Sequence, residues 1–216
     1  MPGRALFTML IYLIAPCFFS SAQAAFCSLR DPNIAITTLY DEQISFRSVV
    51  NIITDKDRNF ISSLLPFTLH RDEVGKHTLY FILKEGKTVG FVQARSELSD
   101  WGVVEIAWAI NLDMTVQGFF YQRCRSSQCR SDKVAKLQRL MRGKTFYQLR
   151  DLLNRDGEVD FSRLDASFGE IAHIVQLTLQ SALKTLALTE SAWQRDIKQV
   201  QLVSQFPLQP RGENNK

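Results

Sequence analysis

The sequence is short of the residues from which metal sites and nucleophilic active sites are usually built. Its 216 residues include four cysteines and three histidines, with no Cys-x-x-Cys and no His-Glu-x-x-His pattern. Such patterns mark many of the zinc and redox sites that can be recognised from sequence. A Gly-x-Ser-x-Gly nucleophile elbow is missing as well. We therefore expect no metal and no hydrolase or transferase centre.

The chain also lacks a strong charge of either sign. Lys and Arg number 26 and Asp and Glu number 22, so the net charge is +4. This excess is spread along the chain and is too small for the basic footprint of a nucleic-acid-binding protein or for a polybasic membrane patch. With 45% hydrophobic and 22% charged residues, the composition is that of an ordinary globular protein. We expect one globular domain and no nucleic-acid partner.

The N-terminus carries a hydrophobic run with the features of an export signal. Arg4 precedes a nearly unbroken apolar stretch over residues 5–19, and Ser20-Ser21-Ala22-Gln23-Ala24 gives the small-x-small ending that signal peptidase accepts. As a helix this stretch spans about 22 Å, less than the roughly 30 Å of a bilayer core. We predict that residues 1–24 are a cleaved signal peptide, that the protein is periplasmic, and that the mature chain does not span a membrane.

The rest of the chain is expected to form a single domain over residues 25–206. A polar tail over 207–216, which contains two prolines, is expected to be disordered. A lipoprotein is not expected, because lipid attachment needs a small residue before the cysteine. Pro16 precedes Cys17, and Phe26 precedes Cys27.

Export leaves an odd number of cysteines in a compartment that favours disulfides. Once Cys17 is removed, the mature chain carries Cys27, Cys124 and Cys129, so we expect one disulfide and one free thiol. Cys124 can pair with Cys129, or Cys27 can tie the N-terminal arm to the domain. A reactive or partner-linking thiol is the alternative to an incidental one, and it is favoured by nearby arginines that lower a thiol pKa, namely Arg123, Arg125 and Arg130.

Hydrophobic periodicity predicts an α+β fold. We expect an antiparallel β-meander packed against short N-terminal helices and a long C-terminal helix. The predicted helices cover 31–40, 54–65, 132–142, 145–153, a long segment from about 166, and 191–203; the predicted strands cover 45–53 and then, as a four-stranded meander, 77–83, 88–94, 103–110 and 115–123.

The strand that follows Trp101-Gly102 has two different faces. One face is large and apolar and suits packing under helices, with Val104, Ile106, Trp108 and Ile110. The other face is small apart from one acid, Glu105, with Val103, Ala107 and Ala109. Glu105 can reach a ligand that lies on the sheet, or it can pair with a nearby arginine or face solvent.

The order and spacing of several short motifs resemble those of a known family. These motifs are Tyr80-x-Ile82, Gly86-Lys87-x-Val89-Gly90-Phe91-Val92, Trp101-Gly102-Val103-Val104-Glu105-Ile106, Ile110-x-Leu112-Asp113 and Leu140-x-x-Gly143-Lys144, ahead of a long C-terminal helix. Over roughly residues 30–187 the chain resembles the FMN-binding domain family, which includes the C subunit of the sodium-pumping quinone reductase, the G subunit of the Rnf complex and the nitrous-oxide regulator R.

In that family a Ser-Gly-Ala-Thr motif at the start of the last helix holds FMN, and its threonine carries the flavin covalently in several members. The corresponding stretch here is Asp165-Ala166-Ser167-Phe168-Gly169-Glu170-Ile171. Ile171 stands at the threonine position, so covalent attachment is not expected. The resemblance implies noncovalent FMN with its phosphate near Ser167 and Gly169, where Ser167 caps the helix, while Glu170 repels a phosphate. Trp101 is a candidate to cover the flavin ring.

Two functions follow from these patterns. The first is an exported FMN-binding module that transfers electrons to or from an envelope partner, with the flavin supplying the redox chemistry. The alternative is a non-enzymatic periplasmic protein on the same fold that has lost flavin. Such a protein would use its sheet face or its Cys124 to Cys129 loop to contact another envelope protein.

Overall fold

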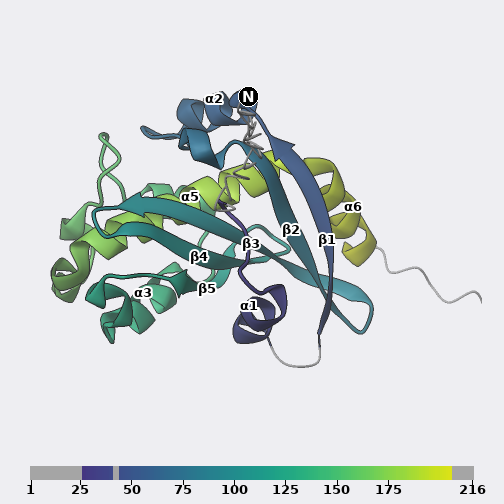
Figure 1. The fold of residues 1–216 in the computed structure, drawn as a ribbon, viewed down its shortest axis with the longest axis horizontal. Helices are drawn as coiled ribbons and strands as arrows, with labels where there is room; N and C mark the ends of the chain where they lie inside the picture. Colours follow the sequence, from purple (N-terminus) through teal and green to yellow (C-terminus); the bar gives the residue numbers. More distant parts are fainter. Residues whose placement is uncertain (1–25, 41–43, 206–216) are drawn as a thin grey trace, which may run out of the picture.

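The computed structural model describes residues 26–40 and 44–205, and for the last two of these it describes the backbone alone. Within these ranges the chain forms an antiparallel sheet with short helices before it and a long helix after it, which confirms the α+β class (Figure 1). The predicted signal segment 1–24 and the predicted tail 207–216 lie outside the described residues.

The sheet is an antiparallel meander in chain order, with one strand more than the four expected. Its strands are β1 (Ser45–Ile53), β2 (Gly75–Lys84), β3 (Lys87–Ser99), β4 (Gly102–Asn111) and β5 (Val116–Arg123). The prediction of a strand over 45–53 is confirmed, and this strand pairs with β2, with Val49 opposite Leu79. β3 is longer than predicted because it continues through Arg95 and Glu97, two charged residues that it buries.

The helices lie where periodicity placed them, with shifted ends. They are α1 (Pro32–Leu39), α2 (Asp55–Leu64), α3 (Lys133–Met141), α4 (Phe146–Arg150), α5 (Ala172–Ala192) and α6 (Gln194–Gln205). Local chemistry explains several of these ends. Asp31 caps α1, with its side chain accepting from the Asn33 and Ile34 amides. Gly143, at φ +74°, follows α3 in the left-handed conformation that glycine adopts without strain.

The two faces of the sheet carry separate cores. The predicted large face of β4 packs against α5 within the main core, while Ala107 and Ala109 on the opposite face form a smaller core with Ala35 and Ile36 of α1. Figure 1 shows α5 running along the sheet, while α1 lies away from α5. Because alanines leave little height above the strands, α1 can pack close to the sheet.

The long helix begins later than expected. Residues 166–171 form a 3-10 helix, η4 (Ala166–Ile171), and α5 starts only after it. The predicted apolar stripe of α5 is buried throughout, from Ile171 to Leu186. The helix is also buried on its other sides from Leu177 to Thr189, because α2, α4 and α6 contact it as well as the sheet.

Candidate functional site

A disulfide closes the loop that connects β5 to α3. Of the two pairings that the sequence left open, the structure has Cys124 bonded to Cys129, with 6.3 Å between their Cα atoms. Inside the loop the buried Ser126 hydroxyl accepts from the Gln128 amide at 3.2 Å. Arg125 and Arg130 stay exposed, so the loop holds two cations at the surface.

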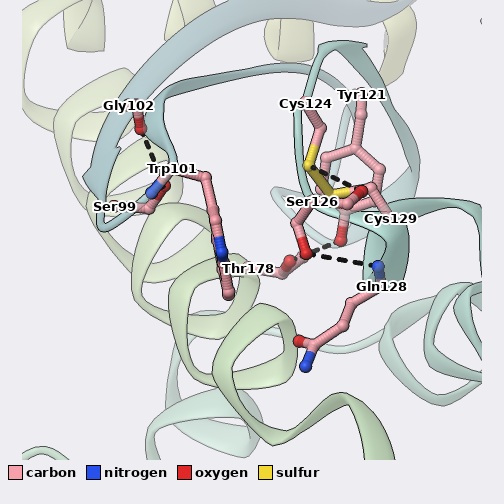
Figure 2. The surroundings of a disulfide bond; sticks show 9 residues. All are labelled: Ser99, Trp101, Gly102, Tyr121, Cys124, Ser126, Gln128, Cys129 and Thr178. Atoms are coloured by element: carbon pink, nitrogen blue, oxygen red, sulfur yellow. Dashed lines mark hydrogen bonds between the residues drawn. A yellow bond between two sulfur atoms is a disulfide. The ribbon is translucent and has the colours of Figure 1, made fainter.

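Trp101 lies at the tight turn between β3 and β4, over the beginning of α5. The turn is fixed by Ser99, whose hydroxyl donates to the Gly102 carbonyl at 2.7 Å. Trp101 is 37% exposed, and its indole packs edge-to-face against the His173 ring of α5, with ring centroids 4.6 Å apart. Figure 2 shows Trp101 and the disulfide above the same stretch of α5, where Thr178 is hydrogen-bonded to Tyr121 at 2.7 Å.

The start of the C-terminal helical segment is already occupied by a carboxylate of the protein. Asp165, and not Ser167 as expected, is the capping residue, because its Oδ1 accepts from the Ser167 amide at 2.9 Å. Lys136 of α3 pairs with Asp165 at 2.5 Å and, with the Ser167 hydrogen bonds, holds the pKa of that carboxyl far below its usual range. Glu170 similarly pairs with Lys133 at 2.9 Å. Both lysines near this helix start are therefore neutralised by acids of the chain.

The contacts of Asp165 and Glu170 determine whether the start of this helical segment can bind the phosphate of FMN. A phosphate near Ser167 and Gly169 would meet Asp165 and Glu170, two like charges, and the Ser167 amide is no longer available to donate to it. Gly169 itself is exposed at the surface. The residues at this position therefore do not suit the anionic group of a flavin nucleotide.

Glu105 is committed to two arginines on the α1 side of the sheet. Arg30 pairs with it through two side-chain nitrogens, and Arg123 donates to Oε1 at 3.4 Å. Burial alone would raise the pKa of Glu105, but the two guanidinium groups outweigh it and lower that pKa. Since Trp101 packs against α5 on the other side, the sheet separates these two candidate ligand contacts. The interpretation of Glu105 as an arginine partner is confirmed.

Among residues 26–40 and 44–205 the free thiol is Cys27, and it is buried. Its Sγ lies 3.7 Å from Arg95 Nη1 and accepts from the Ser96 amide at 3.4 Å. Burial raises the pKa of this thiol in spite of the Arg95 charge. Arg123, Arg125 and Arg130, which were expected to activate a thiol, are neighbours in sequence of the disulfide cysteines. None of them is among the groups that shift the pKa of Cys27.

A buried ion cluster, absent from the sequence predictions, lies between the sheet and α5. It consists of Glu73, Arg95, Glu97 and Lys184, none of them more than 8% exposed. Arg95 donates to Glu73 at 3.0 Å, and Lys184 contacts both glutamates. Burial alone would raise the pKa of Glu73, but Arg95 and Lys184 leave it lowered. The alternation of Phe91, Gln93, Arg95 and Glu97 along β3 was a signal that these charges share the core-facing side.

A surface cavity of about 460 Å³ lies at the opposite end of β3 and β4 from Trp101. It is lined by residues that include Tyr40, Val89, Gln117 and Arg142. None of the candidate site residues from the sequence lines it.

Residues 26–40 and 44–205 hold no group of three or more His, Cys, Asp or Glu side chains placed to bind a metal ion. In the same ranges, every helix is too short or too polar to cross a bilayer. No protein-family model, curated protein or solved structure matches this chain.

Proposed function

We propose that this protein is an exported, non-enzymatic binding module that contacts an acidic partner in the cell envelope. Its contact surface is the disulfide end, which we define by Trp101, Arg125, Arg130 and His173. The observation that carries the proposal is the disulfide-closed loop, which lies on the same end of the molecule as the partly exposed Trp101 (Figure 2). Arg125 and Arg130 of this connection are exposed.

The chemistry of the disulfide end suits protein recognition. Tryptophan and arginine are the residues most enriched where binding energy concentrates in interfaces. A short disulfide loop is ordered before it binds, so less conformational entropy is lost on association. Lys133 and Lys136 are neutralised by acids of the chain, whereas Arg125 and Arg130 have no ion-pair partner among the residues that the structure describes. These two charges are left to attract an acidic surface.

The electron-transfer alternative is supported by the resemblance in sequence but not by the helix start. Asp165 and Glu170 occupy the position where a flavin phosphate would need donors. We therefore expect the purified protein to be colourless and to show no visible flavin band, before or after denaturation. A flavin band released by denaturation would overturn the binding-module proposal in favour of the flavin alternative.

Site-directed photocrosslinking in the envelope tests the contact surface. A photoreactive residue replaces Ser127, which is exposed in the loop, or Tyr147, which is 73% exposed on α4 and serves as the matched control. We expect a discrete adduct from position 127 and none of that mass from position 147. The double variant Arg125→Ala/Arg130→Ala should lose the adduct, and Arg155→Ala, another exposed arginine, should keep it.

Salt dependence identifies the electrostatic part of the contact. At about 1 M salt the Debye length falls to about 3 Å, which screens exposed charges, so the adduct from position 127 should weaken. An adduct equally strong from both positions, or one indifferent to Arg125 and Arg130, would refute the disulfide end as the contact surface.

A further inference from the structure

A second surface cavity, of about 400 Å³, lies along the edge strand β5. Figure 1 shows β5 between α1 and α3, and both helices contact it. A cavity of this size suits a small ligand. Among the described residues, one charged side chain lines it, that of Arg142. The uncharged lining includes Leu39 of α1, Gln117, Gly118 and Phe119 of β5, and Gln138 of α3.

A β-bulge turns Gln117 towards this cavity. The neighbouring residues Ala109 and Ile110 of β4 stand opposite Gly118 and Val116, so Gln117 is one residue extra in β5. Such a bulge takes a side chain out of the alternation of its strand, and bulges are frequent at sheet edges and beside functional sites. At Gly118 an added Cβ would meet nothing within 4 Å. The floor of the cavity beside Gln117 is therefore open.

The backbone around Arg142 is held firmly against the start of β5. The Gly143 amide donates to the Val116 carbonyl at 2.7 Å, and the Val116 amide donates to the Lys144 carbonyl at 3.0 Å. The guanidinium is oriented as well, because Arg142 Nε donates to the Gln117 carbonyl at 3.2 Å. Within the described ranges Arg142 has no ion-pair partner, and its two terminal nitrogens make no hydrogen bond. The cavity thus offers a fixed cation with two nitrogens left to donate.

The two glutamines add hydrogen-bonding groups of both kinds. Gln138 Nε2 donates to the Phe119 carbonyl at 2.6 Å, which leaves Gln138 Oε1 to accept. The side-chain amide of Gln117 has no hydrogen-bond partner among the residues that the structure describes. The terminal nitrogens of an arginine match the two oxygens of a carboxylate, and a peptide group brings one donor and one acceptor. The chemistry of the cavity therefore matches a carboxylate next to a peptide group.

We propose that this cavity binds the C-terminal end of a peptide. The terminal carboxylate pairs with Arg142, the last peptide N–H donates to Gln138 Oε1, and the last peptide carbonyl accepts from Gln117 Nε2. The last side chain lies over Gly118, against Leu39. The inference goes beyond the proposed function, because none of these residues belongs to the disulfide end, and each can fail without the other.

Saturation-transfer NMR with two peptide pools tests the site. The full chain is mixed with N-acetyl tripeptides that end in a free carboxylate, or with the same tripeptides ending in a carboxamide, and the strongest binder is then titrated. We expect binding from the acid pool. The Kd of the matched amide should be about tenfold higher, since the amide loses a charge-assisted hydrogen-bonded pair.

A double-mutant cycle assigns that difference to one side chain. Arg142→Gln should raise the Kd of the acid about tenfold, to that of the amide, and should leave the Kd of the amide unchanged. Arg139→Gln is the matched control, because it removes the same charge from an exposed position of α3 that does not line the cavity. It should bind the acid as the parent does.

A second variant tests the position of the peptide. Gly118→Val fills the open floor and should weaken the acid and the amide alike. Thermal unfolding is measured for each variant, and Gln117→Ala replaces either one that does not fold. The proposal fails if no peptide of the acid pool binds, if acids and amides bind equally well, or if Arg139→Gln weakens binding as much as Arg142→Gln.

Discussion

Arg95 carries a full positive charge into the space between the sheet and α5, where its guanidinium is fully buried. Two glutamates, Glu73 and Glu97, face this charge and that of Lys184, so the cluster holds two formal charges of each sign. A buried ion pair contributes little net stability compared with well-packed apolar residues, but removal of one partner strands a charge and costs about 3–5 kcal/mol. The cluster therefore fixes how α5 sits on β3, because other placements would separate charges that must stay together.

His77 lies beside this cluster and gives the fold a pH dependence of its own. Its Nε2 donates to the Glu73 carbonyl at 2.7 Å, and burial together with the Arg95 charge lowers its pKa from 6.5 to about 4. Below pH 6.5 the unfolded chain takes up a proton on this ring and the folded chain does not. Folding stability therefore falls as pH drops from about 6.5 to about 4, by up to about 1.4 kcal/mol per pH unit.

The variant His77→Gln isolates this contribution, because glutamine can keep the hydrogen bond to the Glu73 carbonyl without titrating. We expect urea unfolding to show the parent losing stability relative to His77→Gln between pH 6.5 and pH 4, as follows from the lowered pKa. His173→Gln, at an exposed position, controls for the loss of a histidine as such. A difference between parent and His77→Gln that is constant over this pH range would contradict the prediction.

At the scale of elements, local chemistry determined most boundaries. The strand over 45–53 was found from alternation alone, and α1 from the Asp31 cap and Pro32. Strand pairing depends less on local sequence than the element boundaries do. The apolar pattern of β1 does not show that β1 continues the meander on the far side of β2, because that depends on a connection through α2. The helical segment begins near residue 166 as predicted, but its first six residues form the 3-10 helix η4, which Asp165 caps, and the α-helix begins only at Ala172.

Close packing of α1 on the sheet makes one glycine indispensable. A Cβ at Gly90 in β3 would lie 2.5 Å from the Tyr40 hydroxyl and 2.7 Å from the Ile110 carbonyl oxygen, whereas a Cβ at Gly118 in β5 would meet nothing within 4 Å. Gly90→Ala should therefore lower the free energy of unfolding by about 1–3 kcal/mol, since the Ile110 backbone must move.

The matched substitution is Gly118→Ala, in the neighbouring strand on the other side of β4. It should leave the free energy of unfolding unchanged or raise it by up to about 1 kcal/mol, because alanine reduces the freedom of the unfolded chain. Urea unfolding of the two variants measures the difference. Equal losses from both would show that the contact of Tyr40 with Gly90 does not limit packing.

At the scale of the whole molecule, the candidate residues from the sequence divide between two places. Trp101, Ser167 and the disulfide lie around the start of α5, while Glu105 and Cys27 join the first described residues to the sheet. Residue types alone could single out each of these positions. Their grouping could not be predicted, because Arg30 reaches Glu105 across 75 residues of chain and Cys27 reaches Ser96 across 69. Such contacts leave no periodic trace in sequence.

The two sides of the sheet differ in how firmly they are held, and this predicts the order in which the molecule opens. α5 has 21 residues and is buried almost throughout, so its amides should exchange with solvent only when the whole domain unfolds. α1 has eight residues, fewer than an isolated helix needs for stability in water, and it depends on the small core beneath it. Native-state hydrogen exchange should therefore give α1 a lower opening free energy than α5. As denaturant is added, the opening free energy of α1 should converge on that of α5, which is the free energy of global unfolding. Equal opening free energies for α1 and α5 at all denaturant concentrations would instead mean that the sheet and the helices on both its faces form a single cooperative unit.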